Sequence, residues 1–401
     1  MGEMVGVVAG SPCSLQALSR GVSNRGPSVV RNAVVGCRSW RRVGRIGDTN
    51  IRLRNNSNLG GSLRRLESLK LGAVIVAERD SYTRRVRECS ASLRDGEEVL
   101  TGESSTPSEP GIWMSDVVVK KRPNYFKDRS WTSKDLTYAG YMAFMHGLCL
   151  LAPATFSWDA LGVSLGLYVI TGLFGITLSF HRNLSHKSFK LPKWLEYSFA
   201  YCGVQAVQGD PLEWVSSHRY HHQHCDTEKD PHSPYEGFWH SHMGWLLDDR
   251  RTQERVGARN NVGDMDKDPF YQFIQRTYPI HPIMMAVALY VMGGFPYLIW
   301  GMALRVVWVY HITWFVNSAS HVWGSQKWNT GDLSRNNWWV ALLAFGEGWH
   351  NNHHAFEYSA RHGLEWWQLD PTWWIICALE AVGVATKVKL PKKEHMEKLA
   401  L

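Results

Sequence analysis

Two stretches of 20 residues, 137–156 and 161–180, contain no Lys, Arg, Asp or Glu. A helix of about 20 apolar residues is long enough to cross the hydrocarbon core of a bilayer, where backbone polar groups must be satisfied within the helix. Only residues 157–160 separate the two stretches, so we expect a tight antiparallel hairpin. The alternative is a pair of core helices in a large soluble protein.

A second candidate pair of spans covers 280–300 and 301–320, in which Arg305 is the one charged residue. A long cationic side chain near a helix end can extend to the membrane surface, which is what we expect of Arg305. The sequence therefore predicts an all-α integral membrane protein with four transmembrane helices in two hairpins.

Basic residues flank the first hairpin on both sides, whereas its connector carries only Asp159. Basic flanks mark the side that is not translocated, so both ends of the hairpin should face one compartment. Two such hairpins place residues 181–279 and 321–401 together on that side. Three shorter Trp-rich segments, 194–208, 338–345 and 373–384, are typical of interfacial helices lying along the membrane.

The first 70 residues differ from the rest of the chain. They hold 12 of the 44 Lys and Arg, 9 Ser and only three acidic residues, so the remainder has 32 basic against 33 acidic residues. An Arg-rich, Ser-rich, acid-poor leader is typical of an organelle transit peptide, with a basic tail that binds an acidic partner as the alternative. We expect cleavage between residues 70 and 90, a flexible polar segment over 71–110 and one domain over 111–401. A nearly neutral body also argues against nucleic-acid binding.

All 18 histidines lie at or after His146, and eight of them form three clusters. The clusters read HRNLSH at 181–186, HRYHH at 218–222 and HNNHH at 350–354. Neutral imidazole suits Fe, Zn, Cu or Ni. On a helix, positions i, i+3 and i+4 share a face, so we expect each HxxHH to direct three ring nitrogens at one locus.

The number of histidines indicates two metal ions, because eight imidazoles exceed the needs of one. Seven scattered cysteines without a CxxC pair argue against iron–sulfur chemistry and against a disulfide framework. The boxes also lack carboxylates, unlike the carboxylate-bridged di-iron bundles. We therefore expect a histidine-box di-iron domain on one side of the membrane that activates O2.

The three clusters, in this order, resemble the histidine boxes of the membrane fatty acyl desaturases, in the stearoyl-CoA delta-9-like branch. The resemblance runs from about Trp131 to Asp370 and includes Asp-Pro-His at 230–232, Gly-Trp-Leu at 244–246 and Gly-Glu-Gly-Trp at 346–349. The segment Asn-Ser-Ala-Ser-His at 317–321 is similar to one that in this family adds a ninth histidine ligand and an asparagine acting through water.

The resemblance implies a set of iron ligands, with Asn317 reaching iron through water. The implied ligands are His181, His186, His218, His221, His222, His321, His350, His353 and His354. How these nine divide between two irons stays open, and His321 enters the set only through the resemblance.

The residues of the three boxes are similar to those of plant members of that branch. Together with the Arg-rich, Ser-rich leader, they resemble the chloroplast delta-7 desaturases of palmitoyl-monogalactosyldiacylglycerol. The implied reaction is O2-dependent formation of a cis double bond in a saturated acyl chain, with two Fe2+ as cofactor in a multi-pass chloroplast membrane protein. Ferredoxin would then supply electrons, with cytochrome b5 and the endoplasmic reticulum membrane as the alternatives.

Three other functions stay open: a delta-9 acyl-lipid or acyl-CoA desaturase, a histidine-box di-iron lipid hydroxylase, and a histidine-rich membrane metal transporter. A transporter requires ionisable residues along the spans, and the first hairpin offers only His146 there. Several further residues could orient ligands or be ordinary loop residues. They are His224, Asp226, Glu228, Asp230, His232, His240 and His242.

Overall fold

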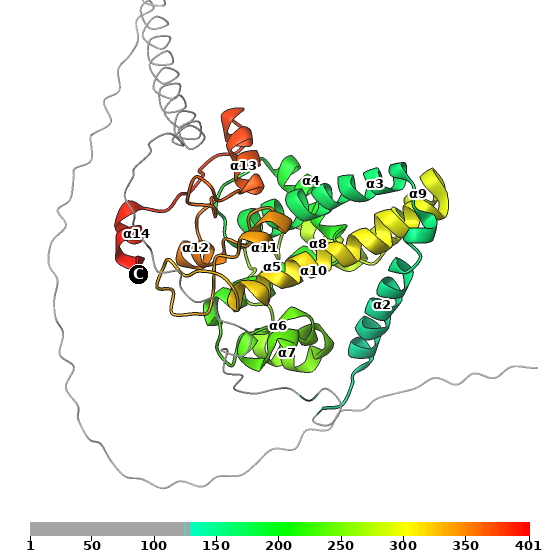
Figure 1. Ribbon diagram of the computed structural model, residues 1–401, viewed down its shortest axis with the longest axis horizontal. Coiled ribbons are helices and arrows are strands. Elements are labelled where there is room, and N and C mark those ends of the chain that lie inside the picture. The colour runs from blue at the N-terminus through cyan, green and yellow to red at the C-terminus, as the bar shows by residue number, and fades with distance from the viewer. Residues whose placement is uncertain (1–123, 125–128) are drawn as a thin grey trace, which may run out of the picture. The chain divides into compact units, whose positions relative to one another are not determined.

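The computed structural model describes Asn124 and residues 129–401 (Figure 1). The predicted transit peptide and polar segment, 1–110, lie outside these residues. Within the described part the chain is helical and contains isolated β-bridges but no strand, which agrees with the predicted all-α class.

The first predicted hairpin begins with α2, Ser133–Cys149. Thr132 caps α2 and Asp135 returns the hydrogen bond, so two free backbone N–H groups are satisfied. After a short 3-10 turn, η1 (Pro153–Thr155), the chain reverses into α3, Trp158–Tyr168, which Ser157 caps. α3 continues as the π-helical η2, Val169–Ser185, which carries the first histidine box at its C-terminal end.

Two helical stretches are long and apolar enough to cross a membrane, Trp158–Ser185 and Ile280–His321. The second consists of α9 (Ile280–Tyr297), η5 (Leu298–Leu304), α10 (Arg305–Asn317) and η6 (Ala319–His321). Apolar side chains on α9 face outward, with Val291 77% and Met292 66% exposed. Such a surface suits lipid better than water.

The turn of the second hairpin differs from the prediction, which placed it between residues 300 and 301. The helical backbone breaks at Gly293 and Gly294 instead, and Gly294 has a φ of 63° and ψ of −152°. This conformation is open to glycine because it has no Cβ. The chain then folds back, so that Gly301 packs against Leu289.

Because the turn lies at Gly294, Arg305 follows it by eleven residues and is no longer next to the turn. The prediction that Arg305 extends to the membrane surface is wrong. Arg305 is 1% exposed. It donates hydrogen bonds to the carbonyl oxygens of Gln205 at 2.6 Å and Gly301 at 2.9 Å. A buried cation is tolerated only where such acceptors replace water.

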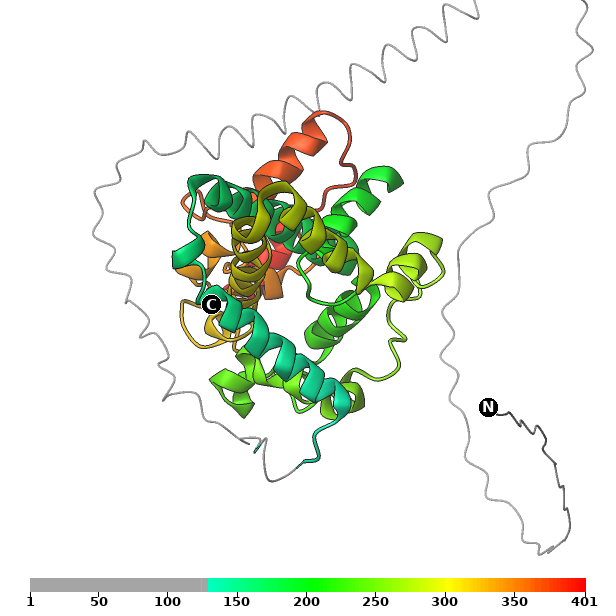
Figure 2. The ribbon, with the colours of Figure 1, turned by 90° about the vertical axis from the view of Figure 1, so that its right-hand side faces the viewer.

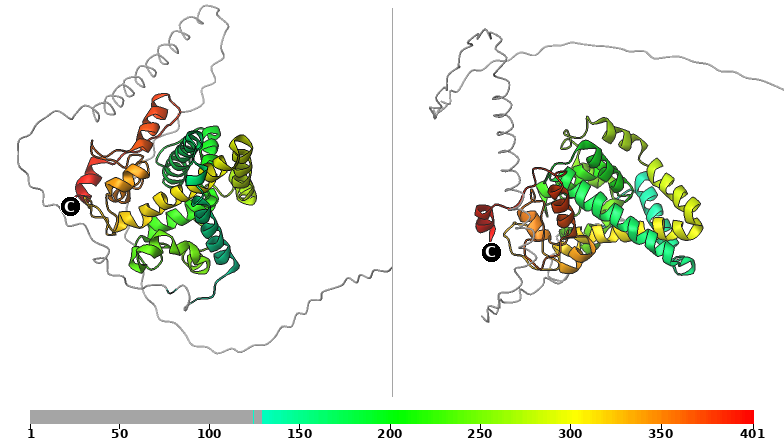
Figure 3. Two further views of the ribbon diagram at one scale, coloured as in Figure 1. Left: turned by 45° about the vertical axis from the view of Figure 1, so that its right-hand side comes forward. Right: turned by 90° about the horizontal axis from the view of Figure 1, so that it is seen from above.

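The remaining helices gather at the end of the bundle where η2 and α10 finish (Figures 1 and 3). They include α4 (Lys193–Val204), α5 (Pro211–His224), α11 (Trp338–Leu343), α12 (His350–Ala355) and α13 (Pro371–Ala381). The short helices α6 (Phe238–His242), η3 (Pro234–Glu236), η4 (Gly244–Leu247), α7 (Asp249–Val256) and α8 (Pro269–Thr277) fill the long connection after α5. α14, Lys393–Leu399, ends the chain.

The three predicted interfacial segments are helical and correspond to α4, α11 and α13. Each exposes a tryptophan: Trp194, Trp338 and Trp374. Their position along a membrane stays a prediction. Figure 2, turned by 90° from Figure 1, looks onto the side of the molecule where α3 and α9 lie.

Backbone contact between η2 and α4 fixes the position of the first histidine box. A Cβ on Gly175 would lie 2.5 Å from the backbone N of Gly203, and one on Gly203 would lie 2.5 Å from the Phe180 ring. The two helices therefore touch where neither has a side chain. Phe180, fully buried, directly precedes His181.

Candidate metal centre

The nine predicted ligands come together in two adjacent groups, within which the possible ligand atoms lie within 4.8 Å of one another. The first group, named here the five-histidine group, consists of His181, His186, His218, His222 and His353. The second, the four-histidine group, consists of His221, His321, His350 and His354. Four separate elements supply these residues: η2 with its C-cap residue His186, α5, η6 and α12.

Each HxxHH box divides between the two groups, so the expectation that a box points at one locus is wrong. On α5, His218 and His222 belong to the five-histidine group and His221 to the four-histidine group. On α12, His353 and His354 separate in the same way. Adjacent residues on an α-helix point about 100° apart, so two neighbouring histidines reach two sites.

The Nε2 atoms of both groups converge. In the five-histidine group, Nε2 of His353 lies 3.0 Å from Nε2 of both His181 and His222. In the four-histidine group, Nε2 of His321 lies 3.0 Å from Nε2 of His350. Nε2 atoms this close require either shared protons or a cation between them.

Carboxylates behind the rings favour the cation. Four histidines have Nδ1 beside an acidic oxygen, which places the proton on Nδ1 and leaves the Nε2 lone pair facing the group. The pairs are His221–Asp230 at 3.0 Å, His321–Asp226 at 3.1 Å, His354–Asp332 at 2.8 Å and His181–Glu347 at 2.5 Å. Nε2 of His354, moreover, is buried and has no hydrogen-bond partner among the described residues.

Electrostatics at the site support neutral rings and charged carboxylates. Burial, with neighbouring imidazoles, holds the pKa of His218, His222 and His353 well below the usual value. Burial alone would raise the pKa of Asp226, but His321 beside it keeps that pKa low. Neutral imidazole is the ligand form, so the five-histidine group suits a metal ion.

Arg182 anchors the first box, a role that the sequence did not reveal. Its guanidinium is fully buried and lies 3.0 Å from Glu347 and 2.9 Å from Asp370. Glu347 thus joins Arg182 to His181, and an Nη1 hydrogen bond of 2.8 Å to the carbonyl of Ala360 holds the arginine. The 346–349 motif was visible in the sequence, but the contact with His181 spans more than 160 residues.

Some of the residues that the sequence suggests could orient ligands lie beside the predicted ligands, and others do not. Asp226 and Asp230 contact the predicted ligands His321 and His221, and His232 lies 3.6 Å from Asp230. Glu228 is exposed on the surface of the same loop. His224 points its ring at Tyr220 on α5.

His242 belongs to a separate chain of three histidines. Nδ1 of His146 lies 2.7 Å from the carbonyl of Met142, so this nitrogen is the donor and its Nε2 accepts from His311 at 3.0 Å. Nδ1 of His311 then accepts from Nε2 of His242 at 3.0 Å, and Nδ1 of His242 lies 2.9 Å from Oγ of Ser318. The carbonyl at one end therefore favours one tautomer along the chain of neutral rings, in which the Ser318 hydroxyl donates to Nδ1 of His242 instead of to the Trp314 carbonyl.

A cavity of about 450 Å³, named here the inner cavity, reaches the five-histidine group at His218. Asn317 also lines it, at the C-terminal end of α10. Much of the remaining wall is aromatic or apolar and includes Tyr141, Met142 and Trp314. Charged residues of both signs line it as well, among them Lys134, Glu213, Asp249 and Arg259. An apolar wall with a few polar groups is typical of a site for an amphipathic ligand.

Comparison of the sequence with known proteins agrees with the family that the histidine boxes resemble. The family model described as "Fatty acid desaturase" matches residues 156–381. Over 305 residues, 76% of this chain and 82% of the relative, the chain is 61% identical to the chloroplastic palmitoyl-monogalactosyldiacylglycerol delta-7 desaturase of Arabidopsis thaliana. It is 54% identical over 298 residues (74% and 96%) to an acyl-CoA C20 Delta5-desaturase of Anemone leveillei. It is also 52% identical over 282 residues (70% and 92%) to delta-9 acyl-lipid desaturase 1 of Arabidopsis thaliana.

Proposed function

This chain belongs to the fatty acid desaturase family, and from that premise we propose that it forms a cis delta-7 double bond in the palmitoyl chain of a plastid galactolipid. The observation that carries the proposal is the five- and four-histidine pair of groups at the wall of an apolar cavity. The 61% identity to a delta-7 enzyme supports the substrate.

We assign one iron to each histidine group, with the nine histidines as ligands. When bound, the two irons would activate O2 for removal of two vicinal hydrogens. The overall reaction is –CH2–CH2– + O2 + 2 e− + 2 H+ → –CH=CH– + 2 H2O. The chain's own contribution is to hold neutral imidazoles in place through Asp226, Asp230, Asp332 and Glu347, since such partners fix ring orientation.

The inner cavity is the proposed acyl site. Its apolar and aromatic walls would exclude water from the reacting carbons, and His218 brings one metal group to that wall. Asn317 lies on the same wall, where its amide would hold a water between the cavity and the metal. The charged part of the wall, with Lys134 and Arg259, would face the polar head group.

The proposal also includes four membrane spans, targeting to the plastid and ferredoxin as the electron donor. The two long apolar stretches and chloroplastic relatives support a chloroplast membrane. The composition of residues 1–70 supports a transit peptide. A fluorescent fusion lacking residues 1–70 should fail to reach plastids while the intact chain reaches them; plastid import of the truncated fusion would refute the transit-peptide assignment.

Lipid analysis tests the enzymatic proposal. The chain would be expressed in a plastid-type host that contains ferredoxin, and each new double bond would be located by mass spectrometry within each lipid class. We expect a delta-7 bond on palmitoyl galactolipid. A delta-9 bond on other acyl groups would refute the substrate assignment but keep the desaturase, and hydroxylated chains without new double bonds would indicate the hydroxylase. Purified protein that moves metal ions across liposomes and retains no fixed iron pair would indicate the transporter.

A further inference from the structure

A second cavity, of about 500 Å³, lies over the metal centre and shares no lining residue with the inner cavity. We name it the outer groove and define it by His186, His222 and His354 on its floor and by Glu357, Tyr358 and His395 on its rim. The floor thus contains ligands from both histidine groups.

Only one layer of imidazole separates the outer groove from the two groups. The side chains of His222 and His354 are 5% and 2% exposed, and both line the groove. Of the nine ligands, four are not fully buried: His218, which faces the inner cavity, and the three on the groove floor. The metal centre therefore has two separate approaches.

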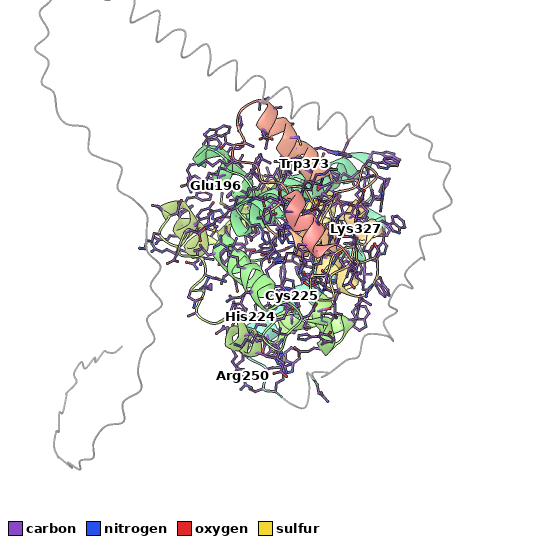
Figure 4. The ribbon with its side chains drawn as sticks, turned by 90° about the vertical axis from the view of Figure 1, so that its left-hand side faces the viewer. Glu196, His224, Cys225, Arg250, Lys327 and Trp373 are labelled. Carbon is purple, nitrogen blue, oxygen red and sulfur yellow. The ribbon has the colours of Figure 1, made fainter. Side chains whose placement is uncertain are left out.

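The C-terminal segment beside the groove is basic. Between Ala385 and Leu401 the chain has five lysines and two glutamates, a net charge of +3, and all five lysines are exposed. They are Lys387, Lys389, Lys392, Lys393 and Lys398. The segment is fixed to the rim, because Tyr358 OH lies 3.2 Å from Nδ1 of His395 and accepts a 3.3 Å hydrogen bond from the N–H of Lys392. Figure 4 looks onto this face, with α14 toward the viewer near Cys225.

The proposed reaction indicates which kind of molecule should bind at the outer groove. The proposed reaction takes two electrons from outside the acyl chain, and the inner cavity is filled by that chain during turnover. A one-electron carrier must bring its redox group close to the metals without entering the inner cavity. The outer groove offers that proximity, and the lysines favour a carrier with an acidic surface.

We propose that the outer groove and the lysines of 385–401 form the docking surface for an acidic one-electron carrier protein, whose electrons enter through the imidazoles of His222 and His354. This inference rests on the proposed function. Glu357 is the one acidic residue that lines the groove, and the net charge of +3 on residues 385–401 outweighs it.

The test compares two charge-reversal variants of the intact mature enzyme. Lys389→Glu/Lys392→Glu changes the docking surface, whereas Arg250→Glu reverses an exposed charge on α7, which Figure 4 labels at the lower edge of the same view. A plant-type [2Fe–2S] ferredoxin is the probe. Its binding is measured by surface plasmon resonance, and the reduction of the enzyme by stopped-flow absorbance at several salt concentrations, with dithionite as a donor that needs no docking surface.

We expect the double variant to bind ferredoxin and accept its electrons at least about tenfold more slowly at low salt, because electrostatic steering changes association rates by about 10- to 1000-fold. Reduction by dithionite and the behaviour of Arg250→Glu should match the wild type. Wild-type binding should also weaken as salt rises, which tests the inference without any variant. Equal ferredoxin rates in all three proteins, or binding insensitive to salt, would overturn the docking surface. An enzyme that dithionite does not reduce would instead overturn the proposed di-iron function, so the two failures are distinguishable.

Discussion

Oδ2 of Asp226 lies 3.1 Å from Nδ1 of His321, so the loop after the second histidine box orients a histidine that belongs to no cluster. The same oxygen accepts a 2.8 Å hydrogen bond from the N–H of Leu333. Asp226 therefore links three distant segments behind the four-histidine group.

Asp226→Asn should lower the metal affinity of the four-histidine group about 10- to 100-fold, because an amide cannot stabilise the ligand tautomer of His321 as a carboxylate does. The backbone should tolerate the change, since Asp226 has a φ of 56° and Asn also adopts this conformation. Iron per protein, measured by mass spectrometry after dialysis against a weak chelator, checks the prediction. Glu228→Gln, in the exposed part of the same loop, is the control and should keep its iron; equal iron retention in both variants would contradict the role of Asp226.

His222→Ala and His354→Ala should each abolish desaturation, but through different metal positions. The first removes a ligand of the five-histidine group and the second a ligand of the four-histidine group. We expect each purified variant to lose metal mainly from one site, which spectroscopy of the remaining iron would show as two different spectra. His224→Ala, on the same helix as His222 but outside both groups, should retain two irons and activity. An active His354→Ala enzyme would refute the ligand assignment.

That these nine histidines come together could be predicted for eight of them, because the eight lie in local clusters whose short spacings do not depend on how the helices are arranged. Their division between two groups could not, because it depends on how α5 and α12 are rotated against each other. His321 needed the family resemblance, since a single histidine carries no spacing. No local pattern marks Asp332, and the motif at 346–349 does not show that Glu347 contacts His181.

Helices were easier to predict than their turns. The run from 280 to 320 has Arg305 as its one charged residue and no polar segment that marks a turn, so the turn was placed near its midpoint. The actual turn lies at Gly293 and Gly294, where backbone conformation rather than polarity decides. That shift also explains why Arg305 is buried within the bundle.

Gly175→Ala should destabilise the fold, because its new methyl group would meet the backbone of Gly203 and a backbone cannot move aside as a side chain can. We expect a cost of at least about 1–3 kcal/mol, typical of overpacking, and displacement of His181 from the five-histidine group. Thermal unfolding in detergent, followed by tryptophan fluorescence, measures the loss. Gly166→Ala is the matched control, since nothing lies within 4 Å of a Cβ there; the two variants should therefore differ clearly in melting temperature, and identical melting would contradict the close helix contact.

His242 should make stability depend on pH. Burial, with the neighbouring His311, lowers the pKa of His242 from 6.5 to about 4. Between these values the unfolded chain binds a proton that the folded chain does not, so stability is complete above about pH 6.5 and falls as the pH decreases toward 4.

His242→Gln removes this titration. At pH 7.5 the variant should be less stable than the wild type, because it loses hydrogen bonds to His311 and Ser318, each worth about 1 kcal/mol. At pH 5.5 the wild type should have lost about 1 kcal/mol through His242, so the difference between the two proteins should narrow. Urea unfolding in detergent at the two pH values measures this, and iron content measured in parallel shows whether metal loss contributes equally to both. A stability difference that stays constant from pH 7.5 to 5.5 would mean that His242 accepts a proton in the folded protein as readily as in the unfolded chain, which its buried place between His311 and Ser318 argues against.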